Sequence, residues 1–135
     1  MQLAESLSRV LSAPQLLGET FYRHLFEQVP EVEPFFEGID MHRQAMLVTM
    51  ALTVIQQHYN QRYPVTQLFL QYLGSGHSAR GIPFDLYPKW RDAMLGTLAG
   101  FHGTDWNEEL SGQWRNAIDL AINEMQSGYA HDHRI

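Results

Sequence analysis

The stretch FYRHLF at residues 21–26 is the clearest sign of how this chain folds. Its apolar positions, continued upstream, recur at spacings of three and four, which is the spacing of one face of a helix. These positions are Leu17, Phe21, Leu25 and Phe26. Pro14 can open the helix, because proline at the first helical position gives up no hydrogen bond. We therefore predict a helix over residues 14–28 with a buried apolar face.

The same spacing continues along the rest of the chain, and proline or glycine stands at most of the breaks. The other predicted helices cover residues 3–11, 39–58, 64–73, 85–102 and 105–125. Gly74, Gly76 and Gly81 are expected to end the fourth helix, and Asp105 to cap the last one. No stretch alternates apolar and polar residues for long enough to make a sheet. The predicted fold class is all-α, with a frayed tail over residues 126–135.

The composition narrows the classes of protein that remain. The chain has 135 residues, 44% hydrophobic and 18% charged, which is typical of one globular domain over residues 1–135. A formal net charge of -6, without a Lys- or Arg-rich cluster, argues against binding nucleic acid or an anionic membrane. No stretch reaches the roughly 18 apolar residues of a membrane span, and no export signal is visible, so we expect a cytoplasmic protein. The absence of cysteine excludes iron–sulfur clusters, thiolate-ligated haem and covalently attached haem.

His77 stands where a metal-ligating imidazole would be useful. It follows Leu73-Gly74-Ser75-Gly76, so the sequence places it at the end of a helix where the chain is about to turn. An imidazole there can point into an adjacent crevice, and a neutral imidazole is a good axial ligand for haem iron. The alternative is a histidine that interacts with the negative end of the helix dipole.

For three further side chains the sequence also leaves two interpretations open: a role in a binding site, or ordinary packing. His42 shares a helix face with Ile39 and Met46, so it can act as a hydrogen-bond donor in a pocket or remain partly exposed. Tyr22 lies in an apolar segment, where its buried hydroxyl needs a partner, either a bound ligand or a backbone carbonyl. Phe36 is either a core aromatic or a face for stacking on a planar cofactor.

Two groups of motifs resemble bacterial single-domain globins and the globin domains of flavohaemoglobins. FYRHLF at residues 21–26, followed by Pro30-Glu31-Val32 and Pro34-Phe35-Phe36, is similar to the second and third helices of that family. Leu73-Gly74-Ser75-Gly76-His77, followed by Gly81-Ile82 and Tyr87-Pro88, looks like the proximal histidine of the family and the turn after it. With Trp114 and the apolar positions that follow, the likeness covers roughly residues 3–126.

The resemblance implies a globin fold of about six to seven helices around a crevice for non-covalently held haem b and its iron. His77 would be the proximal iron ligand, Phe36 would pack on the porphyrin, and Tyr22 would lie over the distal face. The residues expected around the haem are Phe36, His42, Met46, Leu73, His77, Ile82 and Trp90. Those expected near a bound gas are Tyr22, His42 and Met46.

The distal assignment depends on the phase of the helix predicted over residues 39–58. Placing His42 at the distal position turns Met46 and other apolar residues inward, whereas Met41 or Arg43 there turns more polar residues into the core. Many bacterial relatives carry glutamine at this place. A histidine there either hydrogen-bonds to the bound gas or becomes a sixth ligand of the iron.

The chain also departs from the pattern of this family on the proximal side of the expected haem. Flavohaemoglobins have a tyrosine one turn after the terminal-helix tryptophan that supports the proximal histidine, and this chain has Ile118 at that place. A strong electronic push on the iron, useful for peroxide or nitric oxide chemistry, is therefore in doubt.

These residues favour reversible binding of dioxygen, or of carbon monoxide or nitric oxide, for storage, delivery or scavenging. One alternative is a nitric oxide dioxygenase or peroxidase-like enzyme on the same haem. Because 135 residues leave no room for a reductase domain, turnover would need a separate reductase. The other alternative is a gas-sensing module that binds a partner.

Overall fold

The computed structural model describes residues 1–130, which form helices and no strand. The α-helices are α1 (Leu3–Leu11), α2 (Pro14–Gln28), α3 (Met41–Gln61), α4 (Pro64–Ala79), α5 (Tyr87–His102) and α6 (Glu108–Ala130). Three 3-10 helices join them: η1 (Pro30–Phe36), η2 (Phe84–Leu86) and η3 (Gly103–Asp105). The predicted all-α class is confirmed.

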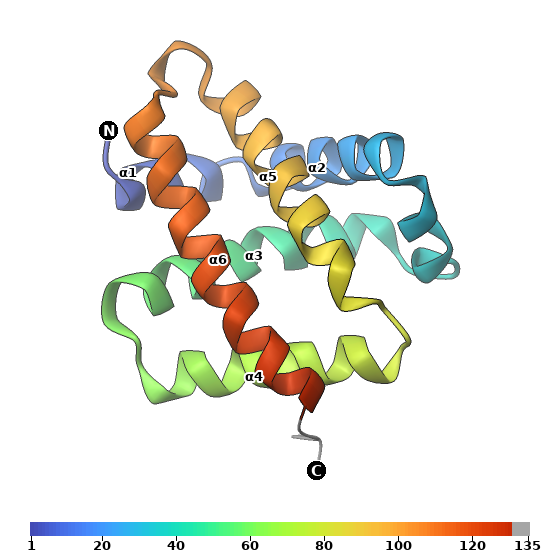
Figure 1. The fold of residues 1–135 in the computed structure, drawn as a ribbon. Coiled ribbons are helices and arrows are strands. Elements are labelled where there is room, and N and C mark those ends of the chain that lie inside the picture. Colours follow the sequence, from blue (N-terminus) through green and yellow to red (C-terminus); the bar gives the residue numbers. More distant parts are fainter. Residues whose placement is uncertain (131–135) are drawn as a thin grey trace.

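The helices cross one another around a single core (Figure 1). Helix α6 lies across α3 and α4, while α2 contacts both α3 and α5. The largest fully buried side chains come from all six α-helices, so the core joins the whole chain. They include Val10, Phe21, Leu52, Leu70, Met94 and Trp114. Burying aromatic and aliphatic groups of this size is the main favourable term in forming such a bundle.

The crossing of α4 and α6 is unusually close. A Cβ built on Gly74 would lie 2.1 Å from the Met125 carbonyl oxygen, and one on Gly128 would lie 2.0 Å from that of Gln71. Glycine therefore serves here to let two helix backbones touch. The predicted helix end at Gly74 or Gly76 is wrong, because α4 continues to Ala79. Gly81, with φ of +79°, turns the chain just beyond it.

Both ends of α6 differ from their prediction. Asn107, rather than Asp105, caps the helix by accepting a hydrogen bond from the Leu110 N–H (2.8 Å). Asp105 instead forms an ion pair with Arg9 at 2.6 Å. At the other end α6 runs to Ala130, so the frayed tail predicted from residue 126 is wrong as far as residue 130. The rest of that predicted tail lies outside the described residues.

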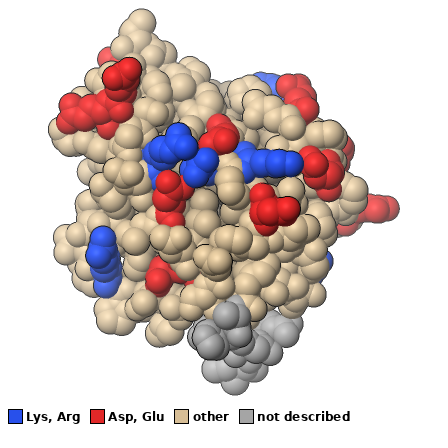
Figure 2. Space-filling model, in the orientation of Figure 1, with Lys and Arg blue, Asp and Glu red and all other residues tan. Residues whose placement is uncertain are grey.

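The surface mixes charges of both signs. Figure 2 shows Lys and Arg side chains lying beside Asp and Glu side chains on one face. Arg91, for example, lies 3.0 Å from carboxylate oxygens of both Asp92 and Asp119. Within residues 1–130, no helix combines the length and the apolar character needed to cross a bilayer.

Candidate functional site

A large cavity opens between α3 and α4 and extends to η1, α5 and α6. Its volume is about 760 Å³, within the range of about 300–1,000 Å³ that is usual for small-molecule and cofactor sites. Its wall is mainly aliphatic and aromatic. Four apolar side chains at the α3–α4 side are about half-exposed and would be covered by a large apolar molecule: Leu47, Met50, Phe69 and Tyr72.

The crossing of α2 and α3 places two polar side chains together on one wall. The helices approach closely at Gly18, where a Cβ would lie 2.2 Å from the Ala45 carbonyl oxygen. Tyr22, one turn after Gly18, thereby meets Gln44, the neighbour of Ala45. The Gln44 Nε2 donates a hydrogen bond to the Tyr22 hydroxyl oxygen at 3.0 Å.

Tyr22 keeps its own proton in this environment. Burial raises the pKa of Tyr22 to about 12, although the hydrogen bond from Gln44 lowers it in part. Because Gln44 donates to the phenol oxygen, the hydroxyl proton of Tyr22 is not used in that bond. None of the other described residues is found accepting it. The cavity wall therefore presents an O–H donor to whatever occupies the space.

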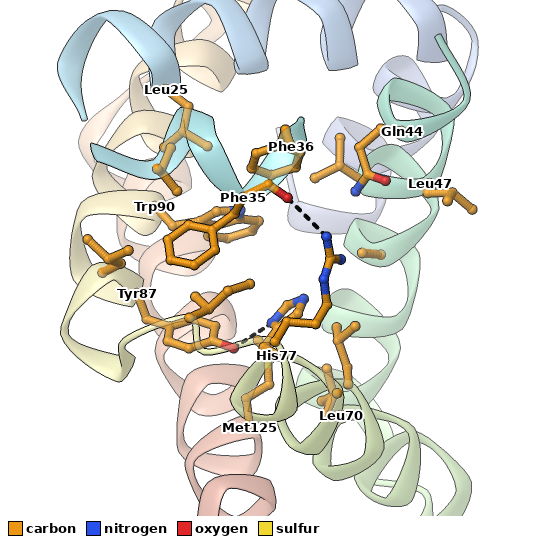
Figure 3. A pocket seen from close by; sticks show the side chains of 18 of the residues that line it. Leu25, Phe35, Phe36, Gln44, Leu47, Leu70, His77, Tyr87, Trp90 and Met125 are labelled. Atoms are coloured by element: carbon orange, nitrogen blue, oxygen red, sulfur yellow. Dashed lines mark hydrogen bonds between the residues drawn. The ribbon is translucent and has the colours of Figure 1, made fainter. Parts of the chain in front are cut away.

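His77 enters the cavity from the opposite wall, near the end of α4 (Figure 3). Its Nδ1 lies 2.6 Å from the hydroxyl oxygen of Tyr87, the first residue of α5. Burial, with a smaller contribution from the Arg80 cation, lowers the pKa of His77 to about 4. The ring is thus neutral near pH 7. Its Nε2 has no hydrogen-bond partner in the described part of the chain, which leaves it available to a ligand.

Most of the residues predicted for the site do line this cavity. They are Tyr22, Phe36, Leu73, His77, Ile82 and Trp90. Phe36 packs edge-on against Tyr22, with ring centroids 5.2 Å apart. Contact of these residues with a haem stays a prediction.

The prediction that His42 lines the pocket is wrong. Asp40 caps α3 by accepting hydrogen bonds from the backbone N–H groups of His42 and Arg43, which puts both residues in the first turn. The exposed His42 ring contacts α2 instead, with its Nδ1 3.0 Å from Gln15 Nε2. Met46 is also outside the cavity and 48% exposed.

The distal alternatives Met41 and Arg43 do not line the cavity either. The helix phase was misjudged because α3 begins at Met41, after the Asp40 cap, so Ile39 does not belong to the helix. Counting from that cap, Gln44 shares a face with Leu47, Val48 and Ala51. A polar residue on an otherwise apolar helix face was the sequence signal that could have identified Gln44 as a site residue.

Tyr87 is the partner of His77 that the sequence did not indicate. The expected place for such a tyrosine, at Ile118, holds a fully buried aliphatic side chain. The hydroxyl group comes from α5 instead, ten positions after His77 in sequence. The hydroxyl partner of His77 is thus supplied by α5 rather than by position 118.

Arg80 is the one side chain with a permanent charge among those that line the cavity. Its Nη2 donates a hydrogen bond to the Phe35 carbonyl oxygen at 3.0 Å. Within residues 1–130, no carboxylate forms an ion pair with it. A ligand with an acidic group at its edge would supply the missing counter-charge.

The residues present fit an iron porphyrin. One neutral imidazole faces an apolar cavity of cofactor size, aromatic side chains line the wall, and a cation lies at its side. Without cysteine in the chain, such a group would be held through the imidazole and by packing.

Comparisons with known proteins agree with this geometry. The family model described as Globin matches residues 19–125. A protein of Arabidopsis thaliana named anaerobic nitrite reductase is 29% identical over 113 residues, covering 71% of this chain and 72% of the relative. A protein of Brassica napus with the same descriptive name is also 29% identical over 113 residues, covering 71% of this chain and 70% of the relative.

Proposed function

Because the chain belongs to the globin family, whose members hold an iron haem and bind diatomic gases, we propose that it binds dioxygen reversibly. The observation that carries the proposal is the placement of His77 opposite Gln44 and its partner Tyr22 across one apolar cavity. A ferrous haem, when bound, supplies an open coordination position for the gas. The motifs at residues 21–36 and 73–88 further favour a likeness to bacterial single-domain globins.

Four residues would hold the cofactor, which we take to be haem b because the chain cannot attach it through cysteine. His77 would bind the iron through Nε2, the ring nitrogen that Tyr87 leaves free. Phe36 and Trp90 would pack on the porphyrin. Arg80 would pair with a propionate carboxylate, since guanidinium groups bind carboxylates through two parallel hydrogen bonds.

Tyr22 and Gln44 would act on the gas. The hydroxyl proton of Tyr22 is available to a partly negative oxygen atom, and Gln44 holds the phenol in place from its other side. A hydrogen bond to such an atom slows the escape of the ligand. His42, outside the cavity, would take no part.

Replacing Tyr22 tests this distal arrangement. In Tyr22→Phe we expect the dioxygen dissociation rate to rise about 10- to 100-fold. This is the effect expected when one hydrogen bond to a charged acceptor is lost. Gln44→Leu should give a smaller rise, because Tyr22 remains but loses its support. Stopped-flow displacement of dioxygen by carbon monoxide measures these rates.

His42→Leu is the matched control for those variants. The exposed ring of His42 contacts Gln15, so its removal should leave the dissociation rate unchanged. A rate in Tyr22→Phe equal to that of the parent protein, or a larger effect from His42→Leu, would contradict the assigned donor.

A second candidate function is the reduction of nitrite. The short His77–Tyr87 contact favours it, because a hydroxyl that accepts from the ring N–H makes the imidazole a stronger electron donor to a metal. The two plant relatives carry this activity in their names. The reaction converts nitrite, one electron and two protons into nitric oxide and water. A separate reductase would supply the electron.

Turnover separates the two candidates. Gas binding alone predicts that nitrite, added to the reduced protein with a reductase and its reduced nicotinamide donor, produces at most one nitric oxide per haem. Continued nitric oxide release, abolished in Tyr87→Phe with dioxygen binding retained, would instead favour the enzyme. A nitric oxide electrode follows the reaction directly.

A further inference from the structure

A long stretch of the chain carries almost no charge. Asp, Glu, Lys and Arg make up 18% of the whole chain, but Arg62 is the only one of them between Gln44 and Ala79. This stretch covers most of α3 and the whole of α4. The acidic residues that give the chain its net charge of -6 therefore all lie on other parts of the sequence.

Exposed apolar side chains gather on one side of α4. They recur at spacings of three and four, which is the spacing of neighbours on one face of a helix. The outer face of a surface helix is usually polar or charged, so this arrangement needs an explanation. The residues are Val65, Leu68, Phe69 and Tyr72.

The exposed apolar surface continues across the mouth of the cavity to α3. Leu47 and Met50 lie at that rim, and Met46 precedes Met50 by about one turn. We call these three residues and the four of α4 the α3–α4 face. A haem inside the cavity would cover only the members that line it. Met46, Val65 and Leu68 do not line the cavity, so they stay uncovered.

The α3–α4 face is large for a surface that meets only water. A fully buried aromatic side chain covers about 150–250 Å². The exposed fractions of the residues in the face run from 46% to 70%. They thus expose on the order of 600 Å² of apolar surface, the upper end of what the largest patch on a monomer shows. A standard protein interface takes about 800 Å² from each partner, so this face and its polar rim have the area of a specific contact.

The charge pattern favours a second copy of the chain as the partner. A two-fold dimer joins identical patches, so a patch with one sign of charge would repel itself. The α3–α4 face has no charged member, and it lets two chains of net charge -6 meet with their acidic residues outside the contact. A lipid surface is a poorer partner, because helices that lie on bilayers are rich in Lys and Arg, and α4 contains neither.

We propose that two copies of this chain associate through the α3–α4 face about a two-fold axis. The mouth of each cavity then lies within the interface. Because Met46, Val65 and Leu68 belong to the face but not to the cavity, the contact forms with or without a bound cofactor. The proposal goes beyond the proposed function and does not depend on it.

Sedimentation velocity of the full chain, from about 1 μM to 1 mM, measures the association. Monomer should convert to dimer as the concentration rises, in haem-free and in haem-loaded protein. Leu68→Glu should raise the dissociation constant at least about 100-fold, because the interface would bury an unpaired carboxylate. Leu16→Glu is the matched control and should not change it, since Leu16 lies on α2 and is 60% exposed, against 59% for Leu68.

Hydrogen exchange locates the contact. Raising the protein concentration should slow amide exchange in α4 and in the first half of α3, and leave α1 unchanged. Circular dichroism of Leu68→Glu should match that of the parent protein, because an exposed position in a helix tolerates glutamate.

Several results would overturn the proposal. A chain that stays monomeric at every concentration would do so, as would a dimer that Leu68→Glu leaves intact. A dimer confined to haem-free protein would also count against it, because the contacts would then be ones that the cofactor replaces. Monomeric protein that instead binds phosphatidylcholine vesicles would assign the α3–α4 face to lipid. Failure to bind haem in a protein that still dimerises would overturn the haem site alone.

Discussion

His77→Ala is expected to lose haem, with affinity reduced by more than about 100-fold, beyond the 10- to 100-fold typical for residues that only support a ligand. The reason is that no other imidazole lines the cavity in the described part of the chain. Titration of the purified protein with haem, followed through the Soret band, measures the loss. In the reduced state the variant should also lack the spectrum of an imidazole-ligated iron.

Two further variants make this result specific to ligation. His77→Gly should regain that spectrum when free imidazole is added, because the small molecule can occupy the space of the missing ring. His42→Ala should bind haem like the parent protein, since His42 is exposed and does not line the cavity. An unchanged reduced spectrum in His77→Ala would refute the proximal assignment.

Gly74→Ala is expected to destabilise the protein by about 3 kcal/mol or more, at or above the upper end of the usual cost of overpacking. The added Cβ would lie 2.1 Å from the Met125 carbonyl oxygen and close to other backbone atoms of α6. Backbone cannot rotate away as a side chain can, so α4 and α6 would have to separate. With total stabilities of about 5–15 kcal/mol for such domains, a large part of the folding free energy would be lost.

Urea unfolding of parent and variant measures this difference. Gly96→Ala is the matched control, because Gly96 lies in α5 where an added Cβ would meet no atom of another helix within 4 Å. That variant should gain about 0.5–1 kcal/mol, the usual advantage of alanine over glycine inside a helix. Equal stability of the two variants would show that the close crossing of α4 and α6 does not restrict residue 74.

Much of the fold was predictable because it depends on local patterns. Apolar spacing and proline positions gave the helices at residues 3–11 and 14–28 with the bounds that the structure shows. Glycine was the less reliable guide. Gly74 looked like a helix end, but it allows two helices to touch, and the residue on the other side of that contact lies about 50 positions away in sequence.

The candidate site was predictable in part for the same reason. Three of its residues are marked by local sequence patterns. Tyr22 lies in an aromatic helix segment, Phe36 follows a proline turn, and His77 lies near a helix end. Gln44 was missed because the helix was predicted to begin two residues too early, and two residues correspond to about 200° of rotation around a helix. The exposed His42 was therefore predicted at the position in the cavity wall that Gln44 occupies.

The sequence by itself determined an all-helical chain, a crevice histidine at residue 77, and the exclusion of any thiolate-held or covalently attached cofactor. Tertiary structure alone decided which polar groups meet in that crevice. The close approach at Gly18 brings Gln44 to Tyr22, and the crossing of α4, α5 and α6 brings Tyr87 and Tyr129 behind His77. Such contacts depend on where helix backbones cross, and crossings are set by the fit of surfaces distant in sequence rather than by local spacing.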